Sequence, residues 1–219
     1  MSNRLILTAT PLFLFWTAAY GQKYEIAPIA AYQRTSREPL GSISSVEPRD
    51  DDTKFRDGAG IGLRLTWNTK GYYGHEIGYL VSRFKLESKV RAEETAAVTV
   101  LRDRVVVQQA FYNFIMYMMP AGERWRPFIT GGAQGYQYGA PKFADWPTGA
   151  TRNWGVNWGG GLKLKLMKHA LVRFDLRDYI GGKPYDLTFQ ESGTGIETKS
   201  QAGGFIHQIE GSVGIAITF

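Results

Sequence analysis

The chain of 219 residues contains no cysteine, which excludes a disulfide scaffold and a thiolate metal site. Helical periodicity is also absent after residue 22. No apolar run beyond that point reaches the ~18 residues that a membrane-spanning helix needs. A net charge of +6 arises from basic residues that are mostly interleaved with acidic ones, so we expect no nucleic-acid partner.

Residues 1–21 have the features of a cleaved secretory signal. Arg4 supplies a positive charge, residues 5–19 form an apolar core, and Ala19 and Gly21 are small residues at the −3 and −1 positions. A membrane anchor is the alternative, but the apolar run is short and contains Thr and Pro. We therefore expect residues 22–219 to form the exported domain.

Period-two alternation of apolar and polar residues runs through this domain and predicts eight strands. Their connectors alternate in length, so that all the long ones lie at one end and all the short ones at the other. Barrels of the outer membrane have this asymmetry. The sequence predicts an all-β, eight-stranded antiparallel up-and-down transmembrane β-barrel located in the cell outer membrane, with a soluble barrel as the alternative. The predicted strands are approximately 23–34, 58–68, 72–86, 104–118, 125–138, 153–166, 170–179 and 204–219.

The segment ALVRFDLRDY, residues 170–179, illustrates the expected polarity. Arg173, Asp175 and Arg177 share one parity, while large apolar residues occupy the other. In a membrane barrel the apolar parity meets lipid and the charges enter a lumen that side chains fill. Near balance of acids and bases is expected there, because an unpaired buried charge costs several kcal/mol. The predicted lumen charge network comprises Glu25, Arg64, Glu76, Lys163, Lys165, Arg173, Asp175, Arg177 and Glu210.

Three strands depart from simple alternation. Pro28 predicts a bulge or an edge position in the first strand. Phe84 and Leu86 differ in parity from Ile77 and Tyr79, which predicts a bulge near residues 81–83. The segment 125–138 is too rich in small residues for a lipid-facing parity to be assigned.

The flanks of residues 87–103 continue to alternate, which predicts that the third and fourth strands protrude as a hairpin. This hairpin and the other long loops offer a surface for a ligand, and outer-membrane lipid and lipopolysaccharide are the expected partners. A plain solvated hairpin is the interpretation that the sequence favours over a binding role. In the binding role, the basic side chains that would contact lipopolysaccharide phosphates are Lys85, Lys89, Arg91, Arg102 and Arg104.

Catalytic signals are weak. His75, His169 and His207 lack the spacing of a zinc site, and we expect no metal or cofactor. The strongest catalytic candidate joins His207 with Glu210 and Ser212, but His207 and Ser212 fall on opposite faces of one strand. We therefore expect no enzymatic activity.

Three stretches resemble small bacterial barrels of the outer-membrane-protein-A-like superfamily. They are RPFITGGAQGY (126–136), RFDLRDY (173–179) and the terminal GIAITF. The resemblance implies an eight-stranded barrel with a structural or surface-interaction role and without catalysis. It also implies that the barrel-assembly machinery reads a terminal signal formed by Val213, Ile215, Ile217 and Phe219. The alternatives are a narrow transport or binding barrel for small or amphipathic solutes and, further off, a lipid-modifying enzyme.

Overall fold

The computed structural model describes residues 23–44, 49, 51–69, 71–91, 97–144, 146–147, 149–185, 187 and 204–219. The predicted signal, residues 1–21, lies outside the described residues.

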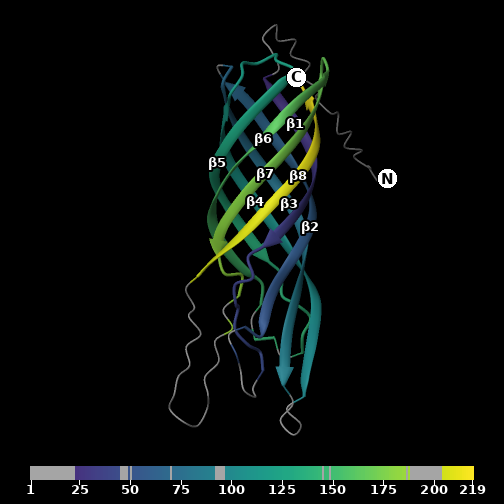
Figure 1. Ribbon diagram of the computed structural model, residues 1–219, viewed down its shortest axis with the longest axis vertical. Coiled ribbons are helices and arrows are strands. Elements are labelled where there is room, and N and C mark those ends of the chain that lie inside the picture. The colour runs from purple at the N-terminus through teal and green to yellow at the C-terminus, as the bar shows by residue number, and fades with distance from the viewer. Residues whose placement is uncertain are drawn as a thin grey trace, which may run out of the picture.

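Eight antiparallel strands close into one barrel in the order of the sequence, with β1 pairing with β8 (Figure 1). This arrangement confirms the predicted up-and-down topology. Among the described residues, no helix is long and apolar enough to cross a membrane. The strands are β1 (Tyr24–Thr35), β2 (Thr53–Thr69), β3 (Tyr73–Arg91), β4 (Val98–Tyr117), β5 (Trp125–Tyr138), β6 (Thr151–Met167), β7 (Ala170–Gly182) and β8 (Phe205–Thr218).

The barrel is apolar outside and charged inside. Ile61 and Leu176 on the outer surface are 73% and 64% exposed, while Arg173 in the lumen is 0% exposed. Alternation places these two chemistries on opposite faces of each strand. A continuous apolar belt around a soluble monomer would be an aggregation site, whereas lipid accommodates it. The barrel therefore spans a membrane, and the soluble alternative is wrong.

Strand β5 follows the same rule. Arg126, Phe128 and Thr130 are buried in the lumen, while Trp125 and Ile129 face outward. The even-numbered positions of this strand are thus the inward ones, which sequence alone left unassigned.

The expectation for Pro28 is wrong. Pro28 pairs in register with Leu63 of β2, and the β1–β8 ladder keeps one register from Ile26 to Ile29 although it skips Ala27 and Pro28. A closed barrel has no edge strand on which to place a proline. Because proline lacks an N–H donor, the β1–β8 pairing is interrupted at this point, but no extra residue is inserted and no bulge forms.

The bulge expected near residues 81–83 is also wrong. Strand β3 pairs with β4 in one register throughout, and the irregularity lies in β2, between Phe55 and Gly58. Phe84 and Leu86 continue the inward parity of Leu80, and each is 0% exposed. The change of pattern reflects an apolar lumen at the loop end rather than a displaced strand.

A ribbon of three strands projects beyond the rest of the barrel, which confirms the protruding hairpin (Figure 1). Pairing of β3 with β4 continues to Arg91 and Val98, while β5 joins β4 only from Val107 onward. Strand β2 supplies the third member, because Thr53 pairs with Ser88. We call residues 53–59, 83–91 and 98–106 the ribbon.

Candidate functional site

The centre of the lumen holds a network of buried ion pairs. Glu76 accepts hydrogen bonds from Arg173 and, at 2.7 Å, from Arg177. Asp175 accepts from the same two guanidinium groups, at 2.7 and 2.8 Å from Arg173 and at 2.8 Å from Arg177. Each of these four side chains is at most 1% exposed. Two carboxylates therefore bridge two arginines in a setting that excludes water.

Arg64 extends the network to β8. Its guanidinium lies 2.7 Å from Asp175 and 2.5 Å from Glu210. Ser212 donates a hydrogen bond to Glu210 at 2.9 Å, which occupies the hydroxyl inside the lumen. Residues distant in sequence are thus joined by charge across the bore.

A second ion pair lies nearer the turn end. Lys163 donates to Glu25 at 2.5 Å and to the Tyr117 hydroxyl at 2.7 Å. The guanidinium of Arg126 stacks 3.4 Å from the centroid of the Tyr117 ring. The sequence did not predict Arg126 as a lumen residue because the parity of β5 was unassigned. The available signal was the motif Arg126-Pro127-Phe128 at the start of β5.

Lys165 does not join this network, although the sequence placed it there. It is only half-buried, and no ion pair connects it to a described residue. The β6–β7 register shifts between Lys165 and Met167, at the turn end of the barrel. A side chain at this end has access to water, so it needs no partner in the bore. The other eight predicted lumen residues lie inside the barrel as ion pairs.

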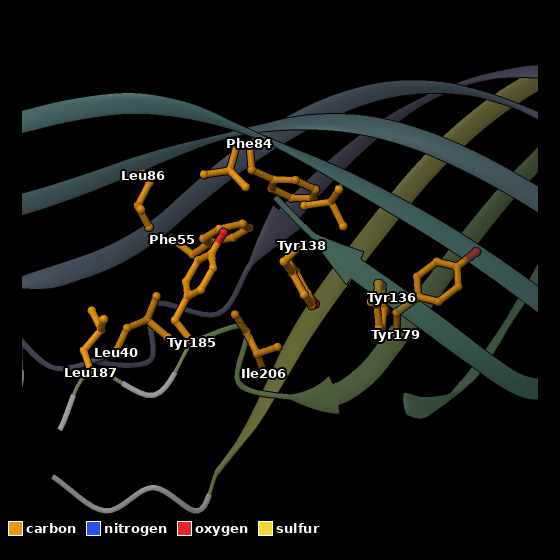
Figure 2. Packing of buried hydrophobic residues seen from close by; sticks show 12 residues of the cluster. Leu40, Phe55, Phe84, Leu86, Tyr136, Tyr138, Tyr179, Tyr185, Leu187 and Ile206 are labelled. Carbon is orange, nitrogen blue, oxygen red and sulfur yellow. The ribbon is translucent and has the colours of Figure 1, made fainter. Parts of the chain in front are cut away.

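The loop end of the lumen is closed by an aromatic cap (Figure 2). Phe55 packs 5.0 Å from Phe84, and Tyr185 of the last loop meets Trp146 edge-on at 4.9 Å between ring centroids. Loop residues thus pack directly onto inward strand residues. The cap consists of Leu40, Phe55, Phe84, Leu86, Val105, Val107, Tyr136, Tyr138, Tyr179, Tyr185, Leu187 and Ile206, with Phe143 and Trp146 against it.

The histidines are dispersed. The Nδ1 atom of His207 lies 3.0 Å from Asp178 on the outer surface, whereas Glu210 and Ser212 are buried in the lumen. His75 stacks on Trp67, with centroids 5.0 Å apart, and His169 contacts the carbonyl of Thr218. No group of three or more metal-binding side chains occurs among the described residues.

A groove of about 600 Å³ lies on the outer face of the ribbon and the adjoining part of β1. Lys85 of β3 pairs directly with Arg104 of β4, and Arg83 lies two residues nearer the belt. The β2 irregularity brings Arg56 and Asp57 to the same surface. We call this the basic groove; its charged lining residues are Arg37, Arg56, Asp57, Arg83, Lys85, Glu87 and Arg104.

Cations outnumber their partners in the basic groove. Glu87 lies 2.7 Å from Arg56 and 3.2 Å from Arg102, and the hydrogen bond from Arg56 is the main cause of its lowered pKa. Asp57 accepts a hydrogen bond from Tyr32 at 2.8 Å.

Three cations of the groove lack such a partner. Among the described residues, Arg83, Lys85 and Arg104 have no carboxylate within ion-pair distance. Like charges on directly opposed strand positions destabilise a sheet. The opposed Lys85 and Arg104 side chains therefore concentrate positive charge on this surface.

Arg91 differs from the other basic residues predicted to meet phosphate. It turns inward and donates to both carboxylate oxygens of Asp52, at 2.7 and 2.9 Å. Burial alone would raise the pKa of Asp52, but this guanidinium and two further hydrogen-bond donors hold it below its usual range. Arg91 thus fastens the first loop to the ribbon. Lys85 and Arg104 line the basic groove. Arg102 lies at the edge of the groove, where it forms an ion pair with the lining residue Glu87, and Lys89 faces outward nearer the tip of the ribbon.

Comparison with known proteins gives a match in fold only. No protein-family model matches the chain, and no curated protein sequence does so. Among solved structures, OprG of Pseudomonas aeruginosa aligns with a TM-score of 0.54 at 12% identity, over 91% of this chain and 97% of that one. Ail, the attachment invasion locus protein of Yersinia pestis, aligns at 0.52 and 10% identity, over 91% and 100%.

A third similar structure is the outer membrane protein AlkL, with a TM-score of 0.51 at 12% identity, over 100% of this chain and 97% of that one. All three are small outer-membrane proteins, and the likeness covers nearly the whole of each. Together with the apolar belt, this likeness identifies the fold as that of a small outer-membrane β-barrel.

Proposed function

We propose that this outer-membrane barrel is a surface-interaction protein that does not conduct solutes and that binds anionic groups through the basic groove. One observation carries the proposal. Arg83, Lys85 and Arg104 form a cluster of exposed cations without carboxylate partners among the described residues, at the level where the barrel leaves the membrane. Arginine is well suited to phosphate and sulfate because its planar fork donates two parallel hydrogen bonds.

The filled lumen supports the absence of conduction. Buried ion pairs occupy the middle of the bore, and the aromatic cap occupies its loop end. A solute would have to displace both layers, and separating buried ion pairs costs several kcal/mol. Within the described residues, the bore itself shows no feature that supports the transport alternative.

The complex formed by one similar structure supports the choice of ligand chemistry. Ail was solved with the heparin analogue sucrose octasulfate, a compact polyanion. A barrel with the same fold and a cationic groove at its outer end is a reasonable receptor for the same class of ligand.

We also propose that the barrel-assembly machinery recognises the last strand, β8. Val213, Ile215, Ile217 and Phe219 all face outward and are 45–64% exposed. A row of apolar side chains along the last strand is available to the barrel-assembly machinery before the barrel closes.

The binding of heparin to the purified barrel in detergent tests the proposal. The triple variant Arg83→Gln, Lys85→Gln, Arg104→Gln should lose about tenfold in affinity, because each exposed charge contact contributes up to about 1 kcal/mol. A control variant, Lys23→Gln, Arg124→Gln, Lys165→Gln, removes the same charge at the turn end, away from the basic groove, and should stay close to the parent protein. Equal losses in both variants, or no binding by the parent, would refute the proposal.

A further inference from the structure

A second groove lies on the lipid-facing surface beside the ribbon. Its volume is about 530 Å³, and its lining is almost entirely apolar. Cross-strand pairing places five outward-facing residues in one row from β2 to β6. In order, the row is Leu63, Tyr79, Ala110, Gly135 and Trp154.

The shape of this apolar groove follows from the sizes of those side chains. Ala110 and Ala133 form a low floor, while Tyr79 and Trp154 form the walls. The Trp154 ring lies over Gly135, 3.0 Å from where a β-carbon would stand, so the small size of Gly135 lets the indole reach the edge of the floor. A cleft of this form accommodates a single flexible hydrocarbon chain better than the flat belt around it does.

The apolar groove leads along β3 and β4 to the basic groove. Tyr79 precedes Arg83 by four residues on β3, which corresponds to roughly 13 Å along a strand. Ala110 and Arg104 are six residues apart on β4, roughly 20 Å. Between the two grooves the Tyr79 hydroxyl donates to Gln108 at 2.6 Å, and the exposed Val81 and Val106 continue the apolar surface up to Arg83 and Arg104. One molecule of lipid length can therefore occupy both grooves.

We propose that the ligand of the basic groove is the phosphorylated headgroup of a glycolipid of the outer leaflet, lipopolysaccharide, with one acyl chain in the apolar groove. This inference rests on the proposed function and specifies its ligand. A free polysaccharide would fill only the upper half of the continuous surface. A lipid phosphate delivers the anion to Arg83 and Arg104 while its chain covers Ala110 and Ala133.

Another apolar groove provides a natural comparison. It lies over β6 and β7, has a volume of about 760 Å³, and is lined by Trp158, Gly160 and Leu176. Asp178 lines it as well, paired with His207. A carboxylate in place of a cationic cluster disfavours a phosphorylated headgroup. The volume of a groove therefore does not decide which one binds a phosphorylated lipid. The nearby cations favour the groove beside the ribbon.

Native mass spectrometry of the barrel with bisphosphorylated lipid A tests the inference. Ala110→Phe fills the floor of the apolar groove and leaves every groove cation in place. Ala30→Phe is the matched control, because Ala30 also faces lipid but lies on β1, outside both grooves. Ala110→Phe should weaken lipid A retention about fivefold, equivalent to about 1 kcal/mol, and Ala30→Phe should not.

Two further measurements separate this inference from the proposed function. Heparin binding should be unchanged in Ala110→Phe, because heparin needs only the cations, and lipid A lacking both phosphates should bind the parent protein more weakly than intact lipid A. Equal retention of lipid A by Ala110→Phe and the parent, or equal binding of the dephosphorylated lipid, would overturn the inference. The proposed function would still stand if heparin binding depended on Arg83, Lys85 and Arg104.

Discussion

Removing the Glu76 carboxylate should measurably destabilise the barrel. Glu76 is fully buried and bonds to Arg173 and Arg177, whose guanidinium groups are also buried. Glu76→Ala leaves these cations with Asp175 as their shared carboxylate. Loss of one member of a buried ion pair costs about 3–5 kcal/mol. Because Asp175 still neutralises part of the charge, we expect the lower value, about 3 kcal/mol.

Urea unfolding in detergent micelles, followed by the gel shift between folded and boiled protein, measures this change. With a slope of about 2 kcal/mol per molar urea, a loss of about 3 kcal/mol lowers the midpoint by about 1.5 M. Unfolding must be shown to be reversible for the free energy to be defined.

Glu87→Ala is the matched control for this measurement. Glu87 also contacts two arginines, but its side chain is 25% exposed and those of Arg56 and Arg102 are 38% and 73% exposed. Pairs exposed to this degree contribute at most about 1 kcal/mol. A midpoint for Glu76→Ala that equals that of Glu87→Ala would refute the view that the lumen network is a buried, mutually compensating set of charges.

Two further predictions concern the loop end. The double variant Phe55→Ala, Tyr185→Ala opens the aromatic cap but leaves the buried ion pairs in place, so ion conductance in planar bilayers should stay at the parent protein's baseline; a raised conductance would show that the ionic layer does not seal the bore. The lowered pKa of Asp52 means that its contribution to stability is present above the ordinary aspartate pKa and is lost as the pH falls through its folded value. Limited proteolysis of the first loop should therefore accelerate in acid, and Asp52→Asn should show the faster rate already at pH 7. Identical cleavage rates in Asp52→Asn and the parent protein would contradict the role of the Asp52–Arg91 pair in fastening the first loop to the ribbon.

The strand count, order and topology could be predicted because lipid imposes a strict rule on every second residue. Leu63 and Leu176 must be apolar where Arg64 and Arg177 need not be, and the rule recurs on most strands. The same rule located most of the lumen charges, since an inward position is fixed once its outward neighbours are known. It gave no answer for β5, where small residues such as Gly131 and Gly132 satisfy either face.

Pairing between distant segments was beyond the reach of the sequence. The inward turn of Arg91 depends on Asp52, a residue 39 positions away that the first loop brings to the ribbon. Arg56 reaches the basic groove only because β2 is irregular between Phe55 and Gly58. Local pattern carries neither piece of information.

The misplaced bulge in β3 has a more general cause. Along this strand the inward positions pass from Glu76 to Phe84 and Leu86, while the outward ones pass from Tyr79 to Arg83 and Lys85. Both faces change polarity within the same few residues. Below that level lipid lies outside, and above it water does, so the ribbon follows the ordinary polarity of a soluble sheet.

The level at which polarity inverts is where the outer surface of the barrel passes from apolar to charged side chains. The basic groove begins at this level, with Arg83 as its nearest cation, and the apolar groove ends just below it at Tyr79. In the ligand assignment proposed above, the cations at this depth would face lipid phosphates rather than bulk solvent. The residues that made the sequence pattern ambiguous, Phe84 and Leu86, therefore lie at the same level of the barrel as the cationic site.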